Sequence, residues 1–419
     1  MKYCFLAMAL LLTTSIAAQE RNEFSIDAQV RSRGEYNNGA IQPREEGDLP
    51  ALFINERARL GMSFRHDFVE LKMSAQHTGV WGQDDIKTRN GRVAMNEAWA
   101  KVRSRNGLFL QAGRQQLAYD DERMLGLGDW NVAGNSHDAV RAGYEGDGHT
   151  AHVFASFNQT AENDPGFYYG GPMPYKTMQG AWYHFQARRA PLGISVLALN
   201  VGKEKGEDGN GRTYFMQTFG GHLTYCPGGF DIATSFYYQT GRSVITHYEY
   251  NTSAFMASGH LGYTFLPALK LTLGYDYLSG NDGRNTNEHA FNPLFGTHHK
   301  FYGAMDYFYA SPLSISLNPG LQDAYASCQS QIGKAVNLQL TYHYFMTAEK
   351  LSNLDKPIGH EIDLQISVRL AKDATLTAGY STMLGTETLD VLKGGYHESW
   401  QDWAWLTLNV SPRIFSTIW

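Results

Sequence analysis

The sequence lacks the long apolar run that a membrane-spanning helix requires. Leu6 to Leu12 is the only extended apolar stretch, and no later segment approaches the roughly 20 apolar residues that cross a bilayer. Together with the positive Lys2 and the small residues that follow, this stretch predicts a secretory signal peptide over residues 1–18. Residues 19–419 are therefore predicted to be exported as one domain without a helical span.

Cysteine and net charge are also scarce. Of 3 cysteines, only Cys226 and Cys328 lie beyond the predicted signal peptide. Two thiols make no disulfide framework, and these two fall on predicted strands that are not neighbours, so we expect no disulfide between them. The formal net charge of −6 is mild and excludes a strongly basic nucleic-acid binder.

Catalytic and metal-binding motifs are absent as well. The 15 histidines are scattered, and the sequence contains no HExxH, no GxSxG and no paired-cysteine metal motif. We therefore expect no enzyme, no metal and no cofactor. A Ser, a His and a polar partner on adjacent strands can still form a barrel hydrolase, because sequence spacing does not exclude that arrangement.

What the sequence does contain is alternation of apolar and polar side chains in segment after segment. In the first of these, Phe24, Ile26 and Val30 share one face, while Asp27 and Gln29 share the other. The 25 Tyr, 22 Phe and 43 Gly accompany a mean hydropathy of only −0.38. This combination predicts an all-β transmembrane antiparallel β-barrel, whose strands need only one apolar face.

Turns between the segments are alternately short and long, which predicts about 18 strands with short periplasmic turns and long extracellular loops. The least certain strands are 137–145 and 320–331. The long loop 280–319 is predicted to fold inward as a constriction or plug. Pro412 either ends the closing strand near Val410 or is tolerated beside an edge of the ladder. The predicted long loops, in chain order, are 37–51, 82–92, 117–136, 160–177, 202–213, 241–251, 280–319, 349–358 and 385–399.

The notable inward-facing residues are arginines. Arg31 and Arg33 on the first strand adjoin Arg57 and Arg59 on the second, so a spacing of two predicts a basic wall in the lumen. A guanidinium stays charged and binds carboxylates through a bidentate fork, so such a wall attracts anions. In a polar lumen, the same charges can also simply satisfy each other. Further candidates on this wall are Arg114, Arg123 and Arg141, with the acids Asp27, Glu35, Glu97, Glu122, Asp129 and Asp138. We expect the aromatics Trp99, Tyr237 and Trp405 to belong to the outward interface girdle.

One stretch of the sequence is more informative about the protein family than the alternation of side chains. Residues 108–138 (LFLQAGRQQLAYDDERMLGLGDWNVAGNSHD), with the earlier FINERARLGMSF, VWGQ and NEAWAKV, resemble the alginate-export outer-membrane porin family. The resemblance implies an eighteen-strand monomeric barrel whose basic constriction passes a polysaccharide of uronic acids. It also implies the anion contacts Arg57, Arg59, Arg114, Arg123 and Arg141, with Glu97, Asp129 and Asp138 as their partners.

These observations predict a passive channel in the outer membrane of a Gram-negative cell. Its solute is predicted to be anionic, an acidic uronate-type oligo- or polysaccharide or another small solute, and the barrel is predicted to contact outer-membrane lipid. Two other functions stay open. One is a non-transporting structural or assembly barrel in an outer-membrane complex, and the other is a barrel enzyme.

Overall fold

The computed structural model describes residues 22–84, 93–159, 162, 174–205, 211–245, 248–266, 268–284, 286–315 and 317–419. The predicted signal peptide, residues 1–18, lies outside the described residues, and so do most of the predicted loops 82–92 and 160–177. Within the described chain, no helix is both long enough and apolar enough to cross a membrane.

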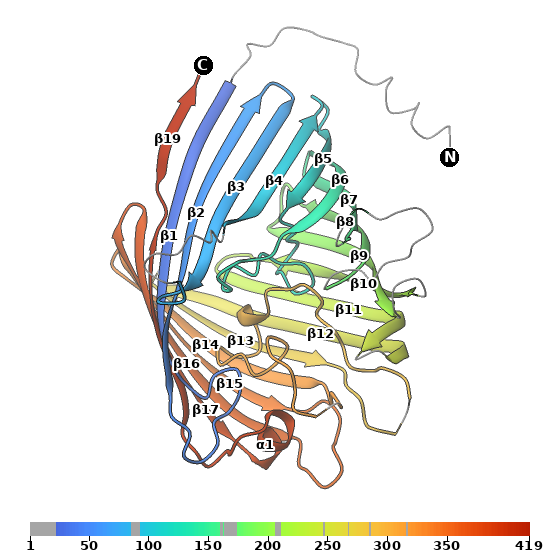
Figure 1. Cartoon of the computed structure of the whole chain (residues 1–419), viewed down its shortest axis with the longest axis vertical. Helices are drawn as coiled ribbons and strands as arrows, with labels where there is room; N and C mark the ends of the chain where they lie inside the picture. The colour runs from blue at the N-terminus through green and yellow to red at the C-terminus, as the bar shows by residue number, and fades with distance from the viewer. Residues whose placement is uncertain are drawn as a thin grey trace.

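Antiparallel strands wind in chain order around one closed sheet (Figure 1). The strands are β1 (Asn22–Asn38), β2 (Ala51–His66), β3 (Val69–Val80), β4 (Val93–Arg103), β5 (Leu108–Gln115), β6 (His137–Gly146), β7 (His149–Phe157), β8 (Thr177–Gln186), β9 (Leu192–Lys205), β10 (Arg212–Tyr225), β11 (Phe230–Ile245), β12 (Tyr248–Leu266), β13 (Leu269–Leu278), β14 (Leu321–Ile332), β15 (Val336–Met346), β16 (Pro357–Ala371), β17 (Ala374–Gly385), β18 (Gln401–Val410) and β19 (Arg413–Ile418). The two short helices are η1 (His298–Lys300) and α1 (Glu387–Lys393).

The barrel closes through its first and last strands. β1 pairs with β2 on one side and with both β18 and β19 on the other, so β18 and β19 are two parts of one interrupted strand. The predicted eighteen-strand antiparallel barrel is therefore confirmed. The interruption lies at Pro412, which has no N–H to donate, yet its carbonyl still accepts a 3.0 Å hydrogen bond from the N–H of Ala28. The hydrogen-bond ladder thus tolerates Pro412, which confirms the second of the two predictions.

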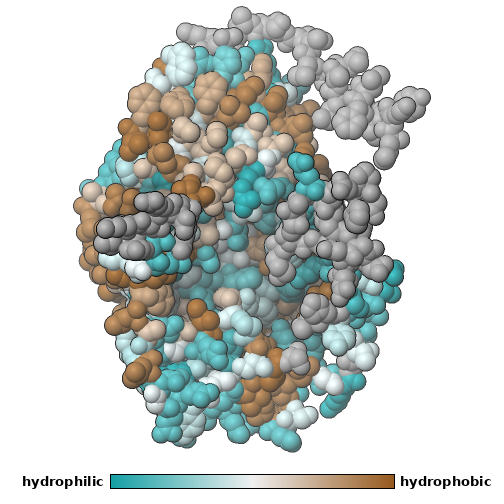
Figure 2. Space-filling view, viewed as in Figure 1, coloured by the Kyte–Doolittle hydropathy of each residue, from teal (hydrophilic) through white to brown (hydrophobic). Residues whose placement is uncertain are grey.

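The alternation predicted from the sequence gives the wall its two faces. Outward apolar side chains such as Val30, Leu60 and Met73 are exposed, as expected of a surface that meets lipid. Figure 2 shows hydrophobic residues over much of the outer wall. Both strands that looked least certain are present, as β6 and β14. The predicted bounds of the long loops 202–213 and 241–251 are wrong, because strands β9 to β12 continue into these segments. Cys226 and Cys328 are both free, as predicted.

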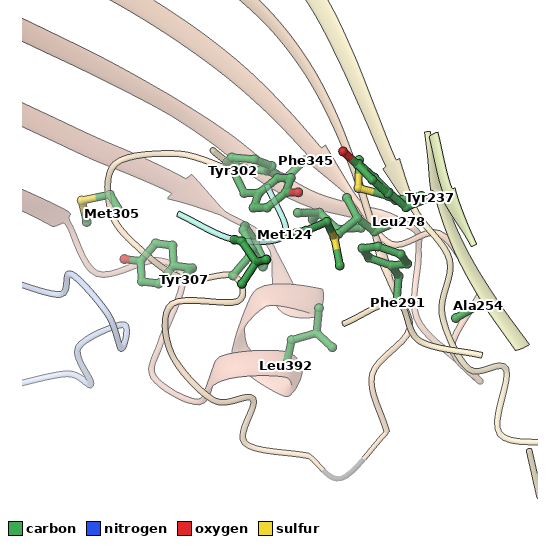
Figure 3. Close-up of a cluster of buried hydrophobic side chains, with 14 of the residues drawn as sticks. Met124, Tyr237, Ala254, Leu278, Phe291, Tyr302, Met305, Tyr307, Phe345 and Leu392 are labelled. Carbon is green, nitrogen blue, oxygen red and sulfur yellow. The ribbon is translucent and has the colours of Figure 1, made fainter. Parts of the chain in front are cut away.

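Two long segments enter the barrel from the end opposite the chain termini: the β5–β6 loop (116–136) and the β13–β14 loop (279–320) (Figure 1). They meet at a parallel bridge between Leu125 and Phe295. Their apolar side chains form a buried cluster with residues of the wall (Figure 3). Tyr302, Met305 and Tyr307 are at most 2% exposed. The inward folding predicted for loop 280–319 is therefore confirmed.

Helix α1 contacts the β13–β14 loop. Its C-cap is Gly394, whose φ of 75° favours a residue without Cβ. Its last residue, Lys393, is 2% exposed and donates to Ser311 Oγ at 2.8 Å and to the carbonyl of Pro312 at 2.6 Å. These two bonds fasten the β17–β18 loop to the β13–β14 loop.

This contact is predicted to tighten as the pH rises. Burial lowers the pKa of Lys393 from 10.5 to about 8. Between these values the opened state binds more protons than the closed state, so the free energy of opening rises with pH. Protease cleavage within residues 386–400 should accordingly slow between pH 8 and pH 10 in the wild type. Lys393→Met should abolish this pH dependence, and a wild type that shows none would contradict the argument.

Candidate functional site

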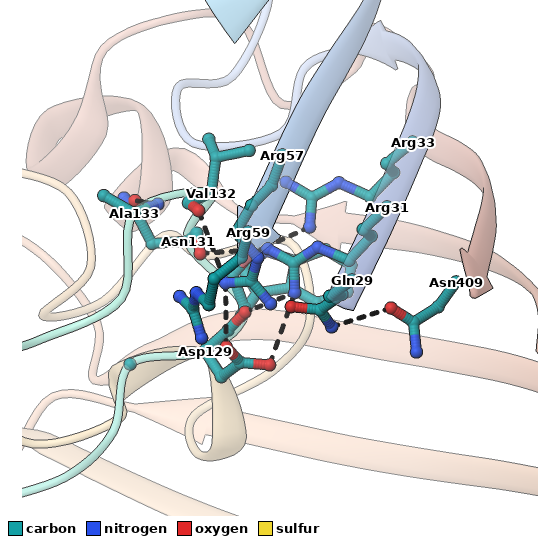
Figure 4. Close-up of polar contacts among 12 residues, drawn as sticks. Gln29, Arg31, Arg33, Arg57, Arg59, Asp129, Asn131, Val132, Ala133 and Asn409 are labelled. Carbon is teal, nitrogen blue, oxygen red and sulfur yellow. Dashed lines mark hydrogen bonds and ion pairs between the residues drawn. The ribbon is translucent and has the colours of Figure 1, made fainter. Parts of the chain in front are cut away.

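Four arginines project from adjacent inner-face positions of β1 and β2. The register places Arg31 opposite Arg57, and Arg59 opposite Gln29 (Figure 4). Because side chains alternate along a strand, Arg33 shares the face of Arg31 and Arg59 shares the face of Arg57. The structure thus places all four side chains on the lumen side, where the sequence predicted them. Their role as solute contacts stays a prediction.

Three of these arginines hold the β5–β6 loop against the wall. Arg31 donates to the carbonyls of Asp129 and Asn131 at 2.6 and 3.0 Å. Arg57 donates to the Asp129 carboxylate at 2.8 Å, and Arg33 to the carbonyl of Trp130 at 2.9 Å (Figure 4). Guanidinium groups suit this task because they carry five donors in a rigid fork. Much of the predicted basic wall is therefore occupied by backbone oxygens of a loop.

The arginine cluster nevertheless retains unused donors. The side chain of Arg57 is fully buried, and its Nε and Nη2 have no hydrogen-bond partner among the described residues. Arg59 lies beside it, donating to Gln76 and Asn96. Asp129, the carboxylate that Arg31 and Arg57 share, is 52% exposed, so solvent reaches the cluster. More positive than negative charge converges here, next to water.

Trp130 connects the arginine wall to the second inward loop. Its ring lies between the guanidinium of Arg33, 3.9 Å from the ring centroid, and the imidazole of His299, stacked at 3.9 Å. Its edges meet Trp403 and Trp405 of β18. Such cation–π and stacking contacts are worth about 0.5–2 kcal/mol each. Trp130 therefore couples the two inward loops to the wall.

Trp130→Ala is predicted to loosen both loops together. Removing the ring leaves a gap between Arg33 and His299 that neither side chain can fill without moving. Limited proteolysis should then cleave both the 116–136 and the 279–320 segments faster than in the wild type. Trp81→Ala, at an exposed tryptophan, is the matched control and should change nothing. Loosening of one loop alone would contradict the coupling.

The structure places Arg123 in a buried pair that the sequence did not predict. Its Nη1 and Nη2 bond the two carboxylate oxygens of Asp276 at 2.9 and 3.0 Å, and its Nε bonds Asp121 at 2.9 Å. Burial alone would lower the pKa of Arg123, but Asp276 outweighs it and holds the pKa above its ordinary value. This bidentate geometry fastens the loop to β13 and argues against the predicted role of Arg123 as a solute contact.

Arg114 and Asp138 pair at 2.9 Å. They lie at the outer ends of β5 and β6, where both line a pocket together with Phe295 and His298 of the β13–β14 loop. Their role as solute contacts stays a prediction. Arg141 on β6 faces inward and donates to Gln111 at 2.9 Å.

Two further expectations are corrected. Tyr237 and Trp405, predicted as outward girdle aromatics, are 1% and 8% exposed and face inward, against Asp120 and Trp130 respectively. Glu97 pairs with Lys72 at 2.8 Å instead of with an arginine. Trp99, the third aromatic of this prediction, donates to Glu97 and shares its inner face.

The inner face of β14 to β16 carries acids that were not predicted from the sequence. His343 lies between Asp323, at 2.9 Å, and Asp363, at 3.6 Å. Glu361, which is fully buried, accepts a 2.8 Å hydrogen bond from the backbone N–H of Met305. The acids Glu361 and Asp363 on β16 thus accept from N–H groups of the β13–β14 loop, just as the arginines on β1 and β2 donate to loop carbonyls. The alternation of side chains along the predicted strands could have revealed these acids, because it places them on the inner face.

A hydrolase arrangement does not emerge from the described residues. His222 Nδ1 lies 2.8 Å from Ser235 Oγ and 4.0 Å from Asp121. A catalytic triad needs the two ring nitrogens of the His to face different partners, whereas here one nitrogen faces both. The described part of the chain also contains no cluster of His, Cys, Asp and Glu able to hold a metal ion.

The comparisons with known proteins agree with this architecture. The model of the alginate export family matches residues 22–163. No match was found among curated protein sequences. Among solved structures, Pseudomonas aeruginosa OccD3 (OpdP) is 13% identical, with 94% of this chain and 92% of that chain covered and a TM-score of 0.60. Acinetobacter baumannii OccAB2 is 10% identical, with 94% and 98% covered and a TM-score of 0.61.

A third similar structure is Pseudomonas aeruginosa OccK2 (OpdF) in complex with glucuronate, 12% identical, with 94% and 98% covered and a TM-score of 0.61. At these identities the likeness establishes the fold. The resemblance seen in the first third of the sequence is confirmed by the family match over that same region. The chain has the β-barrel fold of these outer-membrane porins, and its residues 22–163 match the alginate export family.

Proposed function

We propose that this protein is a passive outer-membrane channel for an anionic solute, with an acidic sugar of the uronate type as the preferred class. The observation that carries the proposal is the buried guanidinium of Arg57. Two of its nitrogens have no partner among the described residues, and it lies with three other arginines around the half-exposed Asp129. Solvent reaches the cluster at Asp129, where the surplus of guanidinium groups would attract a carboxylate or another anion.

Two further points support this solute class. The fold is that of solved porins, one of which was crystallised with glucuronate, and the family match names alginate, a polymer of uronic acids. Arg31, Arg33 and Arg57 already donate to loop carbonyls, which leaves fewer donors for a solute and favours weak, reversible contacts. Weak binding suits permeation, since a solute must leave as readily as it enters.

Planar-bilayer recording of the purified protein tests the proposal. A potassium chloride gradient should give a zero-current potential of the sign expected for chloride preference. Glucuronate should then reduce the chloride current, and glucose at the same concentration should reduce it much less. Equal conductance for both ions, or equal effects of the two sugars, would reject anion selectivity.

One observation favours a second candidate, a non-transporting barrel of structural role. The two inward loops bury Tyr302, Met305 and Tyr307 in the outer half of the barrel, and they are fastened to both walls. If these loops close the bore, the protein should give no conductance steps in the same recordings. A measurable conductance rejects this candidate and keeps the channel.

A further inference from the structure

A cavity at the outer end of the barrel has a chemistry of its own. It measures about 250 Å³ and lies between the outer parts of β9, β10 and β11 and the inward β13–β14 loop. Lys203 and Ser243 line it from the wall, and Asn292, His298 and Tyr309 line it from the loop. Its volume is near the lower end of the range for small-molecule sites, so it suits a ligand the size of a single sugar.

Polar groups without partners converge on this cavity. Ser243 Oγ and Tyr309 Oη are each buried and have no hydrogen-bond partner among the described residues. Buried polar atoms are nearly always satisfied in folded proteins, and leaving one unsatisfied is costly. Two such atoms lining one cavity therefore indicate a site at which a ligand supplies the partners.

The cavity carries one cation, Lys203, that has no partner within the described chain. Glu288 lines the cavity too and keeps its negative charge, although its Oε1 is held in place by Asn281 Nδ2 and by the N–H of Ala290, both at 2.8 Å. Arg242 at the rim pairs with Glu249 at 3.6 Å. No described residue pairs with the ammonium of Lys203, which is only partly exposed. A carboxylate on the ligand would complete this pair.

The apolar part of the lining includes Val201, Met216, Phe291 and Leu294. Hydroxyl and imidazole groups suit sugar hydroxyls, an ammonium suits a carboxylate, and apolar side chains suit the faces of a sugar ring. We propose that this cavity is an outer entry subsite for one uronate-type residue, held by Lys203, Ser243, His298 and Tyr309. This proposal rests on the proposed function for its ligand class, but it names a site separate from the arginine wall.

Titration calorimetry of the full-length protein in detergent tests the site, with glucuronate as the probe and glucose as the uncharged comparison. The titrations use a background of Arg31→Gln and Arg59→Gln, so that the arginine wall contributes little. Lys203→Met should weaken glucuronate binding about tenfold or more, the effect of losing one charge-assisted hydrogen bond. Lys350→Met, at an exposed lysine of another outer loop, should leave the affinity unchanged.

Tyr309→Phe separates a binding role from a structural one. Because the hydroxyl has no partner in the described chain, its removal should raise the unfolding temperature slightly while it weakens glucuronate binding several-fold. A structural tyrosine would instead lower the unfolding temperature and leave binding intact. Heat-modified migration in gels checks that each variant is folded.

Two results overturn the inference: glucuronate affinity in Lys203→Met equal to that in Lys350→Met, or equal binding of glucuronate and glucose. These failures are distinguishable from a failure of the proposed function. A channel without anion preference that still binds glucuronate through Lys203 rejects the function and keeps the site. An anion-selective channel whose binding ignores Lys203 rejects the site and keeps the function.

Discussion

Replacing Arg59 by Glu together with Arg31→Gln should turn an anion-preferring channel into one that prefers cations. The pair of substitutions changes the charge of the inner wall by −3, since Arg59→Glu removes one positive and adds one negative charge and Arg31→Gln removes another. Two unit charges about 4 Å apart interact by roughly 1 kcal/mol even at the dielectric constant of water, and more in a narrow pore. A fall of about tenfold or more in the ratio of anion to cation permeability follows.

These positions are chosen for what they touch. Arg57 is fully buried and bonds both Asp129 and the carbonyl of Val132, so its reversal would place two carboxylates together and release the loop. Arg59 bonds only side chains of the wall, Gln76 and Asn96. A glutamine at position 31 keeps an amide donor for the loop carbonyls. The change in selectivity is therefore separable from a change in loop position.

The zero-current potential in a salt gradient measures this effect. Arg188→Glu with Arg189→Gln is the control, because it makes the same change in charge at exposed residues of a periplasmic turn. The control should keep the wild-type potential. If the Arg31 and Arg59 substitutions leave the anion preference as it was, the arginine wall does not select the solute.

The strands and the arginine wall were predictable because they depend on local spacing. A period of two decides which face a side chain occupies, and Arg31, Arg33, Arg57 and Arg59 each follow it within one strand. The same rule separates two candidates. Asp138 and Arg141 are three residues apart, so a regular strand cannot put both on one face, and Arg141 faces inward beside Gln111.

What escaped the sequence depends on the path of the inward loops. Tyr237 and Trp405 lie in strands with aromatic or polar residues on both faces, so alternation alone did not orient them. Their inward positions follow from loop partners, Asp120 and Trp130, that are far away in sequence. The pair of Arg123 and Asp276 spans 153 residues. Closure of the barrel and the fold of two loops bring these groups together, and neither leaves a local pattern.

The loops also explain why the predicted solute contacts divide into two kinds. Strand arginines point into the lumen whatever the loops do, and they remain candidates for solute contact. Arg123 lies in the loop itself and is used to fasten it. A charged residue in an inward loop of a barrel therefore serves first to satisfy buried polar groups, because an unpaired buried charge is expensive. The charges left for function are those on the strands.

The pair of Arg123 and Asp276 should show the largest effect on the structure. Arg123→Met leaves the Asp276 carboxylate buried without its partner, and breaking a buried ion pair in this way costs about 3–5 kcal/mol. We expect the β5–β6 loop to detach from β13, which proteolysis of residues 116–136 and a lowered unfolding temperature would report. Asp276→Asn should cost less, because the amide oxygen still accepts from Arg123.

The double variant with Arg123→Met and Asp276→Asn completes a double-mutant cycle. Its loss of unfolding free energy should be clearly smaller than the sum of the losses in the two single variants. The exposed pair of Arg114 and Asp138 offers a control of the same chemistry, since both side chains are over 40% exposed and bond at 2.9 Å. Arg114→Met and Asp138→Asn should each cost less than about 1 kcal/mol. Losses that add in the double variant, or that match those of the control pair, would show that the buried pair does not anchor the loop.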